Sequence, residues 1–144
     1  MSCVPNILFA HDLIRKPVPT FRDHALGPRF IASGLGRAFC PAATDKAGVY
    51  AFDAVKPGPV AGPGGKPRAP HIVVCIFSRG MLRQIHTRLY FPDEPANATD
   101  PILALVPGDR RGTLIAHKQG SGDPALYRFD IRVQGDNETV FFDI

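Results

Sequence analysis

The chain has 144 residues, which is enough for one domain with a sizeable core. Hydrophobic residues make up 44% and charged residues 21%, the proportions of an ordinary globular protein, so disorder throughout the chain is excluded. The formal net charge of +4 comes from scattered basic residues, a pattern that favours anionic small molecules or an acidic partner chain over nucleic acid.

Export and membrane signals are not evident in the sequence. There is no run of about eighteen apolar residues, the length that a transmembrane helix needs. The N-terminus shows no secretory signal pattern. Cys3, Cys40 and Cys75 are odd in number and widely spaced, so neither a disulfide framework nor a thiolate zinc site is expected. The sequence therefore predicts a cytoplasmic protein with reduced thiols.

The first half of the chain predicts little regular structure. Residues 1–20 carry no recognisable motif beyond a short apolar stretch that could form a strand. Residues 49–55 predict a strand, because Tyr50, Phe52 and Ala54 alternate onto one face. Residues 58–70 contain four prolines and four glycines, which excludes a helix or a central strand there. A long structured loop is expected in that region.

Two strands are expected in the middle of the chain. Residues 72–77 form an unbroken apolar run rich in β-branched side chains, which predicts a strand buried on both faces. Residues 84–91 alternate instead, with His86, Arg88 and Tyr90 on the face opposite the apolar set. This second strand is expected to bury the apolar set.

The last third adds short helices and two further strands. Residues 101–105 predict a helical turn, and residues 107–117 a short helix with proline in its first turn. Residues 127–133 alternate cleanly between apolar and polar side chains, and residues 139–142 predict a closing strand. The elements together predict an all-β protein, a β-sandwich with one or two short helices.

Six blocks of this sequence, taken together, resemble the intradiol ring-cleavage dioxygenases. The resemblance covers roughly residues 21–144 and is densest after Val55. It implies the same β-sandwich, and an activity that cleaves a catechol between its two hydroxyl groups with O₂. The blocks are Val55–Val60, Pro67–Val74, Phe77–Gly80, Thr87–Phe91, Tyr127–Gly135 and Asn137–Ile144.

The resemblance also exposes missing metal ligands. The family binds ferric iron through two tyrosinates and two histidines, because hard anionic oxygens favour Fe(III). One tyrosine of the family follows the turn that matches Lys56–Gly58, and Val60 stands in its place. A His-x-His pair matches His71 and Val73, so the second histidine is also missing. Val60, His71 and Val73 are therefore degenerate ligand positions, and we expect neither a metal nor a catalytic residue in this chain.

The family includes chains that have lost iron and assemble with an iron-bearing chain. The resemblance implies that this chain is such a subunit, that its partner holds Fe(III), and that the two form a hetero-oligomer. It also maps Arg79 onto an arginine that faces the shared pocket. A guanidinium suits the carboxylate of an aromatic acid, because it stays charged and donates paired hydrogen bonds. The alternative for Arg79 is an ordinary exposed arginine at a strand end.

The N-terminal part departs from the family pattern. The family's iron-free chains carry further strands and a pocket-lining segment before the matched region, and nothing in residues 1–30 resembles that segment. The expected organisation is an unmatched segment over residues 1–20 and an N-terminally incomplete domain over residues 21–144. Unpaired strand edges and low stability are the expected consequences.

Three functional readings follow from these residues. The first is the iron-free subunit of an intradiol dioxygenase, inactive by itself. The second is a truncated β-sandwich remnant with no activity. The third is an independent mononuclear iron enzyme, against which Val60 and Val73 argue.

Overall fold

The computed structural model describes residues 6–9, 42–54, 56–121 and 125–143. The predicted segment boundary near residue 20 lies outside these residues. Strands and short 3-10 helices form the described chain, and no α-helix occurs in it. The elements in chain order are β1 (Asn6–Phe9), β2 (Tyr50–Asp53), β3 (Val60–Ala61), η1 (Pro63–Gly65), β4 (Pro67–Arg68), β5 (His71–Ile76), β6 (Ile85–Tyr90), η2 (Pro95–Thr99), η3 (Leu103–Leu105), η4 (Arg111–Leu114), β7 (His117–Gln119) and β8 (Leu126–Arg128).

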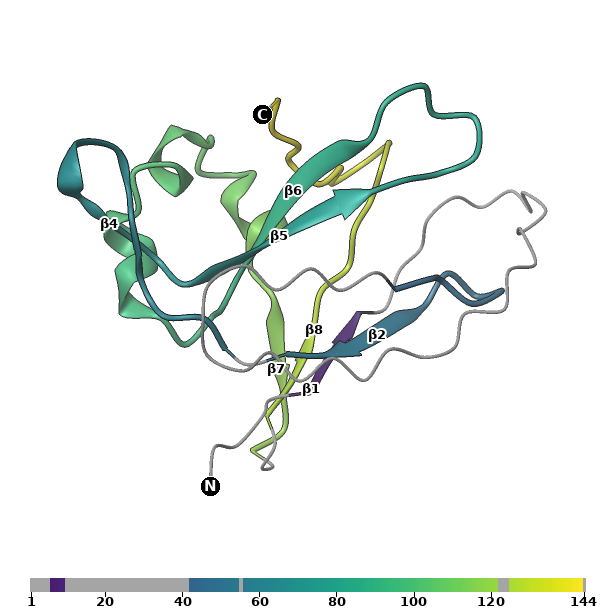
Figure 1. Ribbon diagram of the computed structural model, residues 1–144, viewed down its shortest axis with the longest axis horizontal. Helices are drawn as coiled ribbons and strands as arrows, with labels where there is room; N and C mark the ends of the chain where they lie inside the picture. The colour runs from purple at the N-terminus through teal and green to yellow at the C-terminus, as the bar shows by residue number, and fades with distance from the viewer. Residues whose placement is uncertain (1–5, 10–41, 55, 122–124, 144) are drawn as a thin grey trace.

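Two β layers face each other across the main core, as Figure 1 shows for the hairpin β5–β6 and the strands β2, β1, β8 and β7. The four strands form one sheet in the order β2-β1-β8-β7, in which β1 pairs parallel to β8 and the other pairs are antiparallel. Residues of both layers form the core between them. The largest buried side chains of this core are Leu89, Phe91, Tyr127 and Phe129. The predicted all-β sandwich is therefore confirmed.

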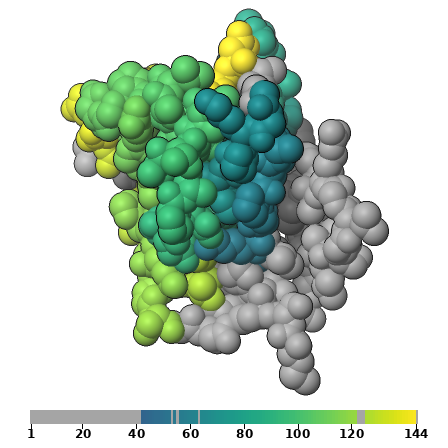
Figure 2. All heavy atoms as spheres, turned by 90° about the vertical axis from the view of Figure 1, so that its left-hand side faces the viewer, coloured from purple at the N-terminus to yellow at the C-terminus, as the bar shows by residue number. Residues whose placement is uncertain are grey.

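The hairpin β5–β6 also has an outer face. A second, smaller core lies there, between the hairpin and the segment that contains η2, η3 and η4. Its buried members are Ala69, Tyr90, Leu103, Val106 and Leu114. Figure 2 shows this segment, in green, lying against the β3–β4 ribbon, in blue. The hairpin is thus covered on one whole face and on part of the other.

The strand β5 corrects one prediction. An unbroken apolar run was expected to be buried on both faces, yet the Val73 side chain is 50% exposed and the Phe77 side chain is 72% exposed. The second core covers only the end of the hairpin near His71 and Tyr90. The apolar run therefore continues past the element that covers its outer face. By contrast, the alternation predicted for residues 84–91 is confirmed, since Leu89 and Tyr90 belong to different cores.

The helical segments are shorter than predicted. The expected helix over residues 107–117 is a turn followed by η4, a single 3-10 turn. Gly108 and Gly112 disfavour a longer helix, and Ile115 leaves the helix to form a bridge with Tyr90. The predicted turn over residues 101–105 is present as η3. Prolines recur at positions 95, 101 and 107, which keeps every helix in this segment short.

The C-terminal strands are also shorter than their patterns predicted. The strand predicted over residues 127–133 keeps a ladder only in β8, although Tyr127, Phe129 and Ile131 are all buried as the alternation required. Beyond β8, hydrogen bonds within the C-terminal segment replace bonds to a neighbouring strand. The backbone N–H of Thr139 donates to the Arg132 carbonyl at 2.9 Å, and the backbone N–H of Arg132 donates to the Thr139 hydroxyl at 2.9 Å. The closing strand is reduced to one bridge between His86 and Phe142.

Candidate functional site

Two of the degenerate ligand positions, His71 and Val73, lie on the outer face of the β5–β6 hairpin, and the third, Val60, lies in the β3–β4 ribbon. Val60 lies opposite Arg68 in the β3–β4 ribbon, and Arg68 reaches the ring of His71. Val73 follows His71 by two residues, so both side chains share one face. Arg68 thus connects the strand pair that contains Val60 to His71, and the family role of Val60, His71 and Val73 stays a prediction. Three cross-strand pairs line this face, namely His71 with Tyr90, Val73 with Arg88, and Cys75 with His86.

His71 has both ring nitrogens engaged. Its Nδ1 lies 2.7 Å from the backbone oxygen of Ala69, which can only accept, so Nδ1 carries the proton. Its Nε2 lies 3.3 Å from Nη2 of Arg68 and therefore accepts from the guanidinium. Burial lowers the pKa of His71, and the charges of Arg68 and Arg88 lower it further. The ring is a neutral acceptor that holds Arg68 in place.

Ferric iron does not fit this donor set. Val60 and Val73 offer no ligand atom, and the remaining nitrogen of His71 already faces a cation. Among the described residues, no group of three or more His, Cys, Asp or Glu side chains is placed to hold a metal. A ferric site needs several anionic oxygens. Val60 and Val73 therefore cannot supply the ligands that a ferric site of this family would need at those two positions.

A buried carboxylate organises the base of the site. Asp100 is fully buried and accepts from the backbone N–H groups of Ala69 at 2.8 Å, Ile102 at 2.9 Å and Leu103 at 2.9 Å. The hydroxyl of Tyr90 adds a fourth contact at 3.3 Å. Burial alone would raise the pKa of Asp100, but these hydrogen bonds outweigh it and lower the pKa. Asp100 thus ties β4 and β6 to the 3-10 segment.

Arg88 is the most unusual side chain of this face. It is only 8% exposed, and its Nε and Nη1 atoms have no hydrogen-bond partner among the described residues. Its guanidinium carbon lies 5.1 Å from the centroid of the Phe142 ring. The alternation had placed Arg88 on this face but did not show that it is buried. An arginine in the middle of a strand, between Thr87 and Leu89, was the available signal.

Two carboxylates that follow β6, those of Asp93 and Glu94, form ion pairs with Lys56 in the turn at Lys56–Gly58. Lys56 Nζ lies 3.1 Å from Asp93 Oδ1 and 2.6 Å from Glu94 Oε1. The hydroxyl of Tyr127 donates to Asp93 Oδ2 at 3.1 Å, and Lys56 lies over the Phe91 ring at 5.1 Å. Asp93 and Glu94 therefore fix the position of Lys56 in the turn that leads to Val60.

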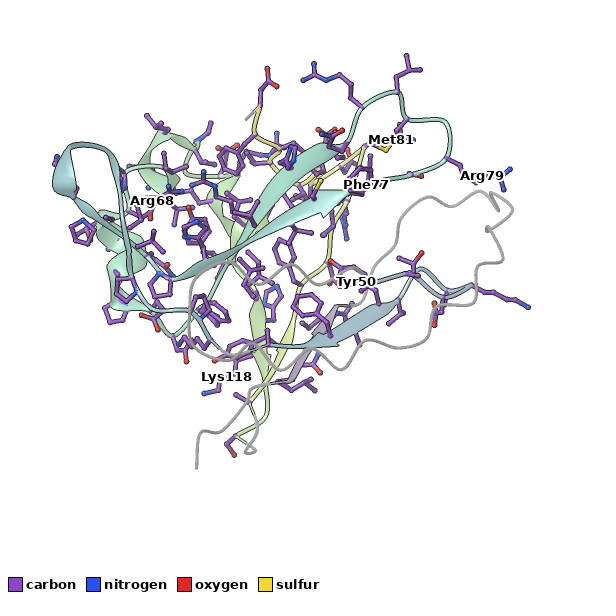
Figure 3. All side chains as sticks on the ribbon, viewed as in Figure 1. Tyr50, Arg68, Phe77, Arg79, Met81 and Lys118 are labelled. Atoms are coloured by element: carbon purple, nitrogen blue, oxygen red, sulfur yellow. The ribbon has the colours of Figure 1, made fainter. Side chains whose placement is uncertain are left out.

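Arg79 lies apart from this site. It occupies the exposed turn that follows β5, where Gly80 adopts a φ of +86° that a side chain would strain. The rise of about 3.3 Å per residue places the two ends of β5 roughly 17 Å apart. Figure 3 shows Arg68 at one end of the hairpin and Arg79 at the other. Any pocket at Arg79 is separate from the degenerate ligand positions.

Comparison with known proteins gives both a fold and relatives. No protein-family model matches the chain. The dioxygenase domain of a dioxygenase and carbohydrate-binding protein fusion from Streptomyces sp. SirexAA-E superposes with a TM-score of 0.56. That superposition covers 97% of this chain and 82% of the other at 21% identity, so it shows the fold alone. The β-sandwich described above is thus a dioxygenase-type fold.

Sequence relatives are more specific. A protocatechuate 3,4-dioxygenase alpha chain from Burkholderia cepacia is 48% identical over 103 residues, which cover 70% of this chain and 50% of the relative. The alpha chain from Pseudomonas putida is 50% identical over 104 residues, covering 71% and 52%. A beta chain from Burkholderia cepacia is 34% identical over 125 residues, covering 81% and 50%.

The resemblance to intradiol dioxygenases is therefore confirmed. More particularly, the chain is similar to protocatechuate 3,4-dioxygenase alpha chains, and its match to a beta chain is weaker. The chain spans about half the length of the curated relatives that it matches.

In the part of the chain that the structure describes, no helix has the length and apolar character to cross a membrane.

Proposed function

We propose that this chain is an alpha-type, iron-free subunit of a protocatechuate 3,4-dioxygenase. A beta chain would be its partner and would hold the Fe(III). The complex would convert protocatechuate and O₂ to 3-carboxy-cis,cis-muconate, in the cytoplasmic breakdown of aromatic acids. The observation that carries this proposal is the 48–50% identity to alpha chains in a chain whose ligand positions, Val60 and Val73, have no donor atom.

The exposed end of the β5–β6 hairpin supports a partner at that end. Phe77 is 72% exposed and Leu82 is fully exposed, and both flank Arg79 in the same turn region. Figure 3 shows Phe77, Arg79 and Met81 gathered at this end of the molecule. Exposed apolar side chains around a charged one are typical of a protein interface. Arg79 is our proposed contact to the substrate carboxylate in a pocket shared with the beta chain.

Co-expression tests the proposal directly. A tagged version of this chain is expressed with an untagged protocatechuate 3,4-dioxygenase beta chain, and both are recovered through the tag. The expected result is a coloured complex that consumes O₂ when protocatechuate is added. Recovery of this chain folded but without the beta chain would overturn the proposal and favour an inactive remnant.

The isolated chain gives a second test. It is incubated with ferric iron and then desalted, and bound iron is measured together with the visible spectrum. The expected result is a colourless chain without stoichiometric iron, because Val60 and Val73 supply no ligand. Stoichiometric iron with the absorption of tyrosinate bound to iron would instead favour an independent iron enzyme.

A further inference from the structure

The outer face of the hairpin holds buried positive charge without a counter-charge. Arg88 has two buried donor atoms without a partner, and the Nε atom of Arg68 is likewise buried without one. Neither guanidinium forms an ion pair with a carboxylate of the described residues. Removing a charge from water is strongly unfavourable unless an opposite charge and hydrogen bonds compensate for the lost hydration. A bound anion would supply both the missing negative charge and the missing hydrogen-bond acceptors for these two guanidinium groups.

The nearest buried carboxylate is already in use. Asp100 accepts from the Tyr90 hydroxyl at 3.3 Å, and the Tyr90 ring lies 5.5 Å from the His71 ring between centroids, so this carboxylate lies close to the cluster. Its two oxygens, however, accept from three backbone N–H groups and from the Tyr90 hydroxyl. It stabilises the 3-10 segment and does not accept from Nε of Arg68 or from Nε and Nη1 of Arg88.

The two guanidinium groups are held on one side of the hairpin. His71 accepts from Nη2 of Arg68, and Arg88 stands diagonally across the strand pair from His71. The Phe142 ring lies against Arg88 and restrains it by a cation–π contact. Burial raises the pKa of Tyr90, and the neighbouring Arg88 opposes that rise. The arrangement is pre-organised, so little side-chain entropy remains to be lost on binding.

Two exposed valines lie opposite the two arginines. Val73 lies directly opposite Arg88 and is 50% exposed, and Val60 lies opposite Arg68 and is 47% exposed. These two positions are the ones that carry ligands in iron-binding chains of the family, according to the resemblance stated above. Their apolar side chains are exposed, so each offers a surface that the non-polar part of a ligand can contact.

We propose that Arg68 and Arg88 form a binding site for a small free carboxylate on this chain, at the place of the lost iron site. The carboxylate accepts paired hydrogen bonds from the guanidinium donors, a geometry that arginine provides and lysine does not. The non-polar part of the ligand lies toward Val60 and Val73. The site is separate from Arg79, so it does not depend on the proposed function or on a partner chain.

Benzoate is a suitable probe, with benzamide as its neutral counterpart of the same shape. The full chain is titrated with each compound in low-salt buffer, by calorimetry and by NMR of the arginine Nε–H signals. Benzoate is expected to bind and to shift the signals of Arg68 and Arg88, whereas benzamide should not. Acetate, which lacks the ring, should bind more weakly than benzoate at the same two arginines. Failure of benzoate to bind would overturn the proposal.

Variants separate this site from non-specific attraction to a basic protein. Arg88→Met keeps the length of the side chain and removes the charge, and should weaken benzoate binding at least tenfold. Arg83→Met removes the same charge from an exposed position and should leave binding unchanged. Arg68→Met provides a second variant of the site in case Arg88→Met does not fold. Equal benzoate affinity in Arg68→Met, Arg83→Met and the unmodified chain would overturn the proposal.

Discussion

Replacing Asp100 by asparagine tests how the base of the site is held together. Asparagine has the same shape but no charge, and only one of its two terminal atoms accepts hydrogen bonds. In the chain, Oδ1 accepts from Ile102, Leu103 and Tyr90, and Oδ2 accepts from Ala69. The amide oxygen can replace Oδ1. The amide nitrogen must then face the Ala69 N–H group, and donor meets donor.

The size of the effect follows from these contacts. Ala69 is fully buried, so leaving its N–H group unsatisfied costs about 1–3 kcal/mol. The three remaining bonds lose the assistance of a charge, which adds about 1 kcal/mol in total. We expect Asp100→Asn to lower the free energy of unfolding by about 3 kcal/mol at neutral pH. With a denaturant slope of about 2 kcal/mol/M, the urea midpoint falls by about 1.5 M.

The pH dependence of this loss has a definite sign. The pKa of Asp100 is lower in the folded chain than its ordinary value of 3.8. The ionised carboxylate therefore contributes stability that is fully present above that ordinary value and is lost as the pH falls through the lower, folded-state pKa. The difference between the unmodified chain and Asp100→Asn should be constant from pH 7 to about pH 5 and should shrink below about pH 4.

Urea unfolding followed by circular dichroism measures both effects. Asp109→Asn serves as the matched control, because Asp109 is exposed and the chemical change is the same. A stability loss below about 1 kcal/mol at neutral pH, or a loss that does not diminish in acid, would refute the proposed role of the Asp100 hydrogen bonds.

Three further substitutions test other parts of the molecule. Leu89→Ala should cost about 3 kcal/mol in urea unfolding because its side chain is fully buried between the layers, whereas Leu82→Ala on the exposed turn should change stability by less than about 0.5 kcal/mol. Thr87→Val should cost about 1–2 kcal/mol, because the buried Thr87 hydroxyl donates to Val140 O at 2.8 Å; Thr87→Ser should restore most of that loss. Arg79→Ala should raise the KM of the reconstituted complex for protocatechuate without impairing assembly. An unchanged KM in steady-state kinetics would remove Arg79 from the pocket.

The periodic parts of the sequence determined the fold class. The alternation over residues 84–91 and the short apolar strands depend on local pattern alone, and pattern decides which side chains face a core. That Val60 and Val73 cannot bind a metal was also evident in the sequence, since a valine side chain has no donor atom in any fold. Only the resemblance to the family predicts that these two are ligand positions, because the hydrophobic pattern carries no information on metal binding.

Tertiary structure alone decided how the site is built. Asp100 reaches back to Ala69 across 31 positions, and Phe142 meets Arg88 only because the C-terminal segment bonds to β6. Such contacts join residues far apart in sequence, and no local periodicity encodes them. The burial of Arg88 likewise depends on the C-terminal segment that places Phe142 against it, and not on the sequence of β6 alone. The sequence by itself therefore determined the fold class and the absence of a donor atom at Val60 and Val73, and the tertiary structure decided which charges surround His71.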